Sequence, residues 1–210
     1  MRALVLCDDY YHPASTVRAG MEPLQGRGFE FDWIENAGEW SVERMATYPV
    51  VVLSKSNGIS AVDRGPWVTE EVEQAFRGYV RKGGGLLAVH SGTADYRDKV
   101  VLRALLGGVF THHPPQCLVT MEPQKGHPLT AGSTAFALKD EHYFMELDDL
   151  QADVFMTTTS EHGTQPGGWT RADGEGRVCI LSPGHNVEVW LHPSFQALLC
   201  NGLRWCAKTI

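Results

Sequence analysis

The sequence lacks the features that bring a protein to a membrane or to nucleic acid. No apolar run approaches the roughly 18 residues that a membrane-spanning helix needs. The start, MRALVLCDDYYHP, has acidic flanks and no small-residue cleavage site. Lysine and arginine form no cluster, and the net charge of −7 disfavours polyanionic partners. We therefore expect a cytoplasmic protein with no membrane partner and no nucleic-acid partner.

Cysteine is scarce, and the short metal and nucleotide motifs are missing. The five cysteines are odd in number and fall inside apolar segments, which favours buried, reduced thiols over a disulfide framework. Neither an HExxH motif nor a CxxC pair occurs. The glycines at 83–85 precede an apolar run, whereas a phosphate-binding loop places its glycines after a strand and before a helix. We therefore expect no nucleotide cofactor.

What is present fits a single domain over residues 1–210. The apolar content of 43% and the charged content of 20% are ordinary for a globular protein. All-apolar runs at 3–7, 50–53 and 86–89 predict strands that are buried on both faces. Apolar residues at helical spacing predict helices after Ser15 or Thr16, after Ser41 and after Thr69, and again at 101–106. This fourfold alternation indicates an α/β, mostly parallel, doubly wound sheet with helices on both faces.

The second half of the chain follows another pattern. Beyond residue 108, strand-like segments at 117–121, 135–138, 154–158 and 178–181 have few helices between them. We expect some of them to pair antiparallel, as an excursion from the main sheet. The alternating segment 29–34 is expected near the sheet edge, and Pro193 begins a terminal helix.

The stretch GGGLLAVHSGT, residues 83–93, is the centre of this fold. Its apolar run stops at His90, and the small residues Ser91, Gly92 and Thr93 suit a sharp turn into a helix. In parallel α/β sheets, ligands bind beyond the carboxyl ends of the strands. A Ser or Cys nucleophile occupies this kind of turn in related architectures. Here the residue is a histidine, so thiolate attack from the turn is excluded.

Nine histidines are the unusual feature, and most lie at strand ends or in loops. Any one of them is more often a surface or hydrogen-bonded core residue than a functional one. Two polar segments stand out as candidate sites: Asp140-Glu141-His142-Tyr143 and Ser182-Pro183-Gly184-His185. The alternative interpretation of the first segment is a solvated turn. His185 and Glu188 would face the same side of a helix and form an acid/base pair; the alternative is a capped turn.

Metal ligation is indicated by residue types and not by a local motif. Neutral imidazoles with one carboxylate suit zinc or another divalent metal, and we predict a site made from His90, His113, Glu141 and His185. His112 is expected to be exposed, since neighbouring side chains of an extended segment alternate. His127 and His192, each followed by proline, are predicted to be structural.

The segments GGGLLAVHSGT, GGVFTHHPP, HPLT, DEHY and SPGH, in this order, resemble the trehalose-utilisation (ThuA-like) family over nearly the whole chain. The resemblance implies a flavodoxin-like fold of the class I glutamine-amidotransferase type. It places the strand-end histidine of the family on His90, its acidic pair on Asp140-Glu141 and its late Gly-His on Gly184-His185. Glutamine hydrolysis is not implied, because the nucleophile is missing.

The family's association with sugar dehydrogenases implies a substrate such as an oxidised glycoside. We expect His90, Glu141 and His185 to be catalytic: His185 as base, Glu141 as its orienting group or a metal ligand, and His90 nearest the developing oxyanion. Further substrate contacts are predicted for His12, Ser91, Asp140, His142, His162 and Glu188. The alternative is a non-catalytic sugar-binding or structural module on the same scaffold. A homo-oligomer is compatible with the sequence.

Overall fold

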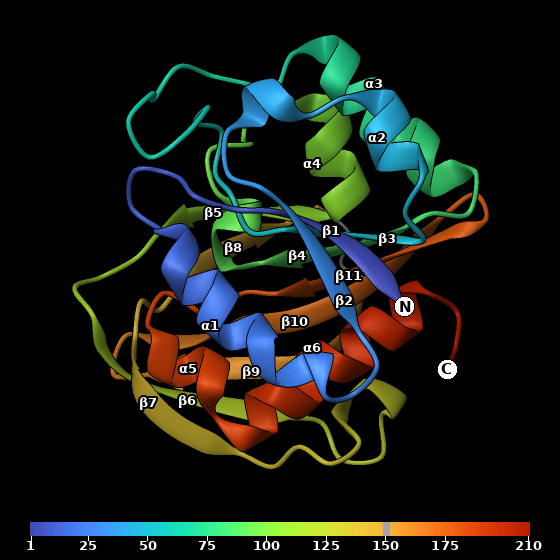
Figure 1. Cartoon of the computed structure of the whole chain (residues 1–210). Helices are drawn as coiled ribbons and strands as arrows, with labels where there is room; N and C mark the ends of the chain where they lie inside the picture. The colour runs from blue at the N-terminus through green and yellow to red at the C-terminus, as the bar shows by residue number, and fades with distance from the viewer. Residues whose placement is uncertain (149–151) are drawn as a thin grey trace.

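The computed structural model describes residues 1–148 and 152–210. Within these residues the chain forms a nine-stranded sheet in the order β2-β1-β3-β4-β11-β10-β9-β6-β7, together with a ribbon of β5 and β8 (Figure 1). The first five strands in that order run parallel: β2 (Glu30–Ile34), β1 (Arg2–Leu6), β3 (Val50–Leu53), β4 (Gly85–Val89) and β11 (Gly176–Leu181). The expected doubly wound architecture is confirmed.

Helices cover both faces of the sheet because β3 and β4 are buried at every position, and β1 and β11 at all but one. On one face, alternate strand residues pack against α1 (Ala14–Gln25), α5 (Val187–Leu191) and α6 (Pro193–Cys206). The residues between them face α2 (Val42–Ala46), α3 (Glu70–Arg81) and α4 (Val100–Leu106). This produces two hydrophobic cores on opposite sides of the sheet, as the period of two in a strand requires. Figure 1 shows the two helical layers.

The remaining strands continue the sheet in antiparallel fashion. They are β10 (Gly163–Asp173), β9 (Asp153–Ser160), β6 (Cys117–Pro123) and β7 (Phe136–Asp140). The expected antiparallel excursion is therefore an extension of the main sheet. Four successive reversals return β7 to the direction of β11, so both strands end at the same edge. That edge carries the polar groups described below.

Local structure departs from the sequence prediction in three places. Helix α1 begins after Pro13 with no side-chain cap, and the carboxylate of Asp8 accepts the N–H of Ala14 instead of Ser15 or Thr16 capping the helix. The long strand β10 and the ribbon of β5 (Gly108–His112) and β8 (Phe144–Leu147) were not predicted. Ser41 and Thr69 do cap α2 and α3. No helix among residues 1–148 and 152–210 is long and apolar enough to cross a membrane.

Candidate metal and active site

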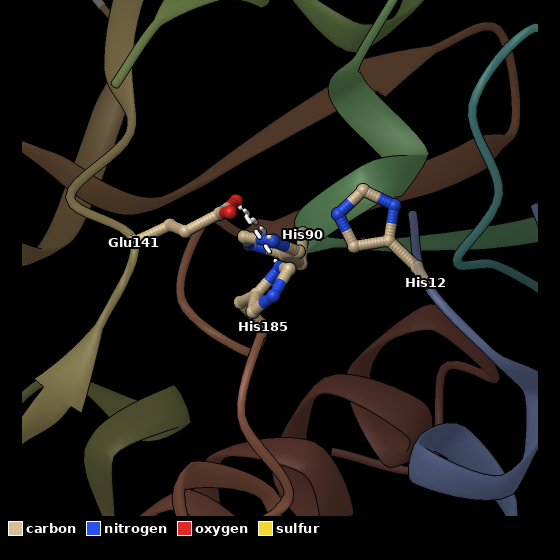
Figure 2. Close-up of side chains that lie close together, drawn as sticks. All are labelled: His12, His90, Glu141 and His185. Atoms are coloured by element: carbon tan, nitrogen blue, oxygen red, sulfur yellow. Dashed lines mark ion pairs between the residues drawn. The ribbon is translucent and has the colours of Figure 1, made fainter. Parts of the chain in front are cut away.

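Four side chains from separate parts of the chain meet at the carboxyl edge of the sheet. His12 comes from the β1–α1 loop, His90 directly follows β4, Glu141 directly follows β7, and His185 lies between β11 and α5. One nitrogen or oxygen atom of each lies within 4.8 Å of those of the other three (Figure 2). We call these four residues the His₃Glu cluster. Three of the four lie beyond parallel strands, where the fold places ligands.

His90 presents an unprotonated nitrogen to the cluster. Its φ of 47° is left-handed, a strained conformation that persists where surrounding structure enforces it. Its Nδ1 lies 2.9 Å from the carbonyl oxygen of Ser182, which only accepts, so Nδ1 carries the proton. Burial lowers the pKa of His90 to about 4. At neutral pH the ring is therefore uncharged, and the lone pair of Nε2 points into the cluster, 3.5 Å from Glu141 Oε2.

Asp9 holds the Nδ1 side of the His12 ring, as the Ser182 carbonyl holds that of His90. Its Oδ1 lies 2.7 Å from His12 Nδ1 and accepts the backbone N–H groups of Tyr11 and His12, while Oδ2 accepts that of Ser56. Burial alone would raise the pKa of Asp9, but these hydrogen bonds lower it to about 2. A carboxylate on Nδ1 fixes the tautomer and leaves Nε2 of His12 available as a ligand atom. The Tyr143 hydroxyl lies 3.4 Å from that nitrogen.

Asp9 was not among the predicted site residues. The pair Asp8-Asp9 directly follows an apolar strand, which is the same signal that singled out His90. The hydrogen bond between Asp9 and His12 joins residues three apart in a loop, where no helical or strand period predicts a contact. The position of Asp9 at the end of a buried strand was the signal that could have found it.

Glu141 contacts three imidazoles. Its Oε2 is 3.2 Å from His185 Nδ1 as well as 3.5 Å from His90 Nε2, and its Oε1 is 3.6 Å from Nε2 of His113. Burial opposes ionisation of Glu141, but His185 and His90 hold its pKa below the usual range. In return, the Glu141 carboxylate raises the pKa of His185.

Asp140 holds the loop that carries His185. Its carboxylate accepts the backbone N–H groups of Gly184, His185 and Asn186 at 2.8, 3.0 and 3.1 Å. The residue is fully buried, and burial raises the pKa of Asp140 to about 6 despite these donors. Asp140 thus positions a histidine through the backbone and does not itself face the cleft.

The donor set of the cluster fits a cation. His90 Nε2 and His185 Nδ1 are both buried, and neither makes a hydrogen bond to any residue that the structure describes. The lone pair of His90 Nε2 and the carboxylate of Glu141 face each other, with His185 Nδ1 beside them, and this arrangement is unfavourable unless a cation or a proton lies between them. Imidazole nitrogen and carboxylate oxygen are the ligands that zinc takes in catalytic sites.

A small cavity opens onto this cluster. It has a volume of about 140 Å³, and His12 and Glu141 form part of its wall together with Tyr11, Ser56, Ala94, Asp95, Phe110, His113 and Tyr143. A larger groove of about 490 Å³ lies between α2 and α3, at the amino ends of β3 and β4. The smaller cavity is the candidate site because the His₃Glu cluster borders it.

The structure brings some of the predicted site residues together and separates others. Of the four predicted ligands, His90, Glu141 and His185 are in the cluster, and His12 occupies the fourth place. His113 lies at the outer side of Glu141 and has a side chain that is 35% exposed. The three predicted catalytic residues therefore lie together in one cluster, and Glu141 is the one of them that lines the cavity.

Several predicted substrate contacts point elsewhere. His142 faces β9, where its ring nitrogens contact Ser160 Oγ and the carbonyl oxygen of Thr158. His162 is exposed in the turn between β9 and β10. Because α5 begins at Val187, His185 precedes that helix and does not pair with Glu188, which borders a separate depression with Lys139. Ser91 is fully buried. His127 and His192 accept backbone N–H groups at helix starts, as structural residues do.

Several proteins of known structure have a similar fold. The chain is similar to a ThuA-like protein from Parabacteroides merdae, with 19% identity over 100% of this chain and 90% of that one and a TM-score of 0.75. A ThuA-like protein from Bacteroides uniformis matches at 20% identity over 98% and 91% of the two chains, with a TM-score of 0.74.

A β-galactosidase from Rahnella matches at 16% identity and a TM-score of 0.69, over 98% of this chain but 31% of that one. Among curated proteins, no sequence match to the chain is found. At these identities, the structural likenesses show the fold alone. The family model for trehalose utilisation, ThuA, matches residues 2–206. Since this match spans nearly the whole chain, the protein belongs to the trehalose-utilisation family.

Proposed function

We propose that this protein is an enzyme of carbohydrate metabolism that acts on a glycoside carrying a ketone on its sugar ring, with a divalent cation bound in the His₃Glu cluster. The observation that carries the proposal is the convergence of His90 Nε2 and His185 Nδ1 on Glu141, with neither nitrogen in a hydrogen bond to a residue that the structure describes. Membership of the trehalose-utilisation family supports a carbohydrate-related role.

His12, His90 and Glu141 would hold the cation. A divalent cation at this position supplies a Lewis acid that polarises the ring ketone and acidifies the adjacent C–H. An enolate can be stabilised by a metal ion or by an imidazolium. The tautomer and low pKa of His90 favour the metal, because His90 Nε2 has no proton to donate at neutral pH.

His185 is proposed as the base. For a ketone at C3, His185 removes the proton from C2, and the electron pair of that C–H bond forms the enolate. The enolate then expels the substituent at C1: the C1–O bond breaks, a C1–C2 double bond forms, and the aglycone leaves as an alcohol after its oxygen takes up the proton that His185 carries. Glu141 raises the pKa of His185 and so strengthens its neutral form as a base. No serine or cysteine nucleophile is needed.

The test combines metal binding with turnover. Protein stripped with a chelator is titrated with Zn²⁺, and thermal stability is followed for the parent protein, for His90→Ala and for His162→Ala, a variant of an exposed histidine outside the cluster. Zinc at about 100 times its Kd stabilises a fold by about 2.7 kcal/mol. The parent and His162→Ala should gain about 5 to 10 °C in Tm, and His90→Ala should gain far less.

Turnover is assayed on a 3-keto disaccharide beside the same disaccharide unoxidised. The proposal expects release of the second sugar from the keto substrate alone, and loss of this activity in His90→Ala. Turnover that is indifferent to chelator would remove the metal from the mechanism. Cleavage of the unoxidised sugar would indicate ordinary hydrolysis. Binding of sugars without any turnover would favour the alternative, a sugar-binding module.

A further inference from the structure

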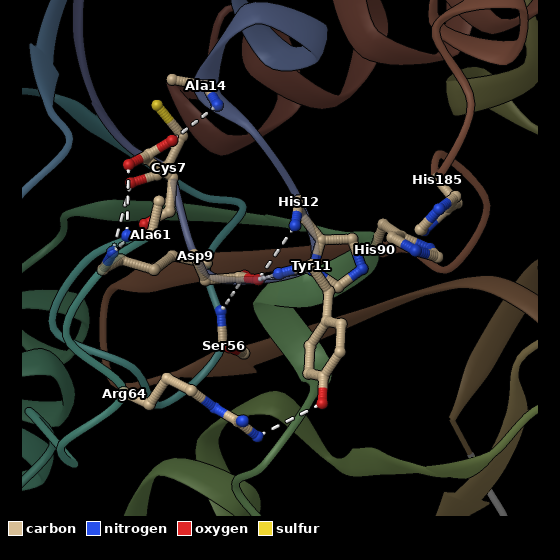
Figure 3. A network of polar contacts seen from close by, with 12 residues as sticks. Cys7, Asp9, Tyr11, His12, Ala14, Ser56, Ala61, Arg64, His90 and His185 are labelled. Atoms are coloured by element: carbon tan, nitrogen blue, oxygen red, sulfur yellow. Dashed lines mark hydrogen bonds and ion pairs between the residues drawn. The ribbon is translucent and has the colours of Figure 1, made fainter.

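The cavity at the cluster continues into a second lobe. The two lobes share Tyr11, Ser56 and Asp95 as lining residues, so they adjoin. The second lobe has a volume of about 90 Å³ and is completed by Tyr10, Asn57, Gly58, Ser60 and Arg64. In Figure 3, Tyr11 lies beside His12, and Arg64 reaches it on the side away from His90 and His185. A ligand that extends from the cluster over Tyr11 therefore enters the second lobe.

Two tyrosines are exposed in this lobe and are held in place by an arginine. Tyr10 is 56% and Tyr11 is 57% exposed, and their ring centroids lie 4.9 Å apart at an angle of 86°. The guanidinium of Arg64 lies 4.5 Å from the Tyr10 ring centroid and donates to the Tyr11 hydroxyl at 3.2 Å. Such contacts fix both aromatic faces before a ligand arrives. Exposed aromatic rings with polar tips suit a ligand that is itself partly apolar and partly polar.

The charges of the lobe indicate a neutral ligand. Arg64 supplies a cation and Asp95 an anion, so a charged ligand would be repelled by one of them. Hydroxyl groups, in contrast, both donate to a carboxylate and accept from a guanidinium. The backbone of Asp95 has a φ of 62°, a conformation that is costly for a residue other than glycine and that clusters at ligand sites. Aromatic faces flanked by one donor and one acceptor group match a sugar ring.

We propose that this second lobe binds the leaving-group sugar of a keto-disaccharide, with one of the perpendicular rings of Tyr10 and Tyr11 against the face of the sugar ring and the other at its edge, and with Arg64 and Asp95 on its hydroxyls. The inference rests on the proposed function, and it adds that the preferred substrate has two sugar rings. The oxidised ring lies against His12 and Glu141, and the glycosidic bond lies near Tyr11.

The experiment compares a two-ring and a one-ring substrate. Tyr10→Ala and Arg64→Ala are assayed on a 3-keto disaccharide and on methyl 3-keto-glucoside. The matched control is Arg18→Ala, which removes a guanidinium stacked 4.3 Å from the Trp33 ring centroid, outside the cavity. Loss of one aromatic or ionic contact should lower kcat/KM for the disaccharide about tenfold. Activity on the methyl glycoside should stay within about twofold, and Arg18→Ala should change neither.

Equal losses on both substrates, or no loss on either, would overturn the subsite while the proposed function stands. If the parent protein turns over neither keto substrate, the proposed function fails, and binding decides the subsite separately. In that case the unoxidised disaccharide and methyl glucoside are titrated in NMR binding experiments. Weaker binding of the disaccharide alone in Tyr10→Ala and Arg64→Ala supports the subsite. Equal binding by parent and variants, or no binding at all, overturns it.

Discussion

Two loops of the site are each held by one buried aspartate, but in different ways. Asp9 belongs to the loop that it holds and contacts the His12 ring directly, and its pKa falls to about 2. Asp140 comes from β7, a strand far from the 184–186 loop in the sequence, and among the described residues its carboxylate hydrogen-bonds only with backbone N–H groups. Its pKa rises to about 6 with burial. The fold therefore stabilises the charge of Asp9 and not that of Asp140.

This difference indicates that the two aspartates have different roles in the site. A charged carboxylate on a ring nitrogen fixes the tautomer and direction of an imidazole, which is the arrangement found behind metal-binding histidines. A carboxyl group that contacts only the backbone fixes the path of a loop and leaves the imidazole free to exchange protons. We therefore expect the first loop to serve cation binding and the second loop to serve proton transfer. Four predictions test this contrast.

The largest effect is expected from removing the histidine of each loop. His185→Ala should lower kcat for a 3-keto disaccharide by about a hundredfold to ten-thousandfold at every zinc concentration, because the base is lost. His12→Ala removes one ligand, so added zinc should restore part of its activity. Both variants are assayed over a zinc titration with His162→Ala as the control. If zinc restored both variants alike, the two loops would share one task.

Most of this architecture can be predicted from the sequence. The apolar runs predict the buried parallel strands, and the polar residues that follow each run mark where the strand ends. His90 could therefore be assigned to a strand end from residues 86–93 alone. His185 and Glu141 were found because polar groups follow apolar segments. Glu141 reaches the same edge only because four antiparallel reversals bring β7 into line with β11, and no local pattern encodes that count. His12 takes the place expected of His113 because His12 follows the parallel strand β1, whereas His113 follows β5, which pairs with β8 outside the main sheet.

The two aspartates should also differ in their effect on zinc affinity. Asp9→Asn should weaken zinc binding about 10- to 100-fold, the usual cost of losing a carboxylate behind a metal-binding histidine. Asp140→Asn should weaken it by about threefold or less, since two of the three backbone donors can still be accepted by the amide oxygen. Affinity is measured at neutral pH by competition with a chromophoric chelator. Equal losses in the two variants would contradict the assignment of separate tasks.

In the absence of metal, Asp9→Asn should also destabilise the protein more than Asp140→Asn. Asp9→Asn should lower the free energy of unfolding by about 2 to 3 kcal/mol at neutral pH, because a carboxylate with a pKa near 2 stabilises the native state by about that amount. Asp140→Asn should change it by about 1 kcal/mol or less, because losing an unfavourable charge offsets a poorer hydrogen bond. Urea unfolding in the presence of a chelator measures both. A larger loss for Asp140→Asn would reverse the comparison.

The smallest effect is a pH dependence specific to Asp140. Folding raises the pKa of Asp140 from its ordinary 3.8 to about 6, so the native state binds this proton more tightly than the unfolded chain. Its contribution to the free energy of unfolding therefore falls as the pH rises from about 4 to about 6. His90 acts in the opposite direction over this range. Burial lowers the pKa of His90 from 6.5 to about 4, and the native state binds that proton less tightly.

Because the two groups oppose each other in the parent protein, only a difference between variants isolates Asp140. The free energy of unfolding of the parent minus that of Asp140→Asn should fall by about 1 to 2 kcal/mol between about pH 4 and pH 6. Urea unfolding of chelator-treated protein across this range provides the measurement. Asp98→Asn, a change at a side chain that is 80% exposed, serves as the control and should give a constant difference. A flat difference for Asp140→Asn would mean that the three backbone N–H groups keep its carboxylate charged. The 184–186 loop would then be held as firmly by charge as the loop of Asp9.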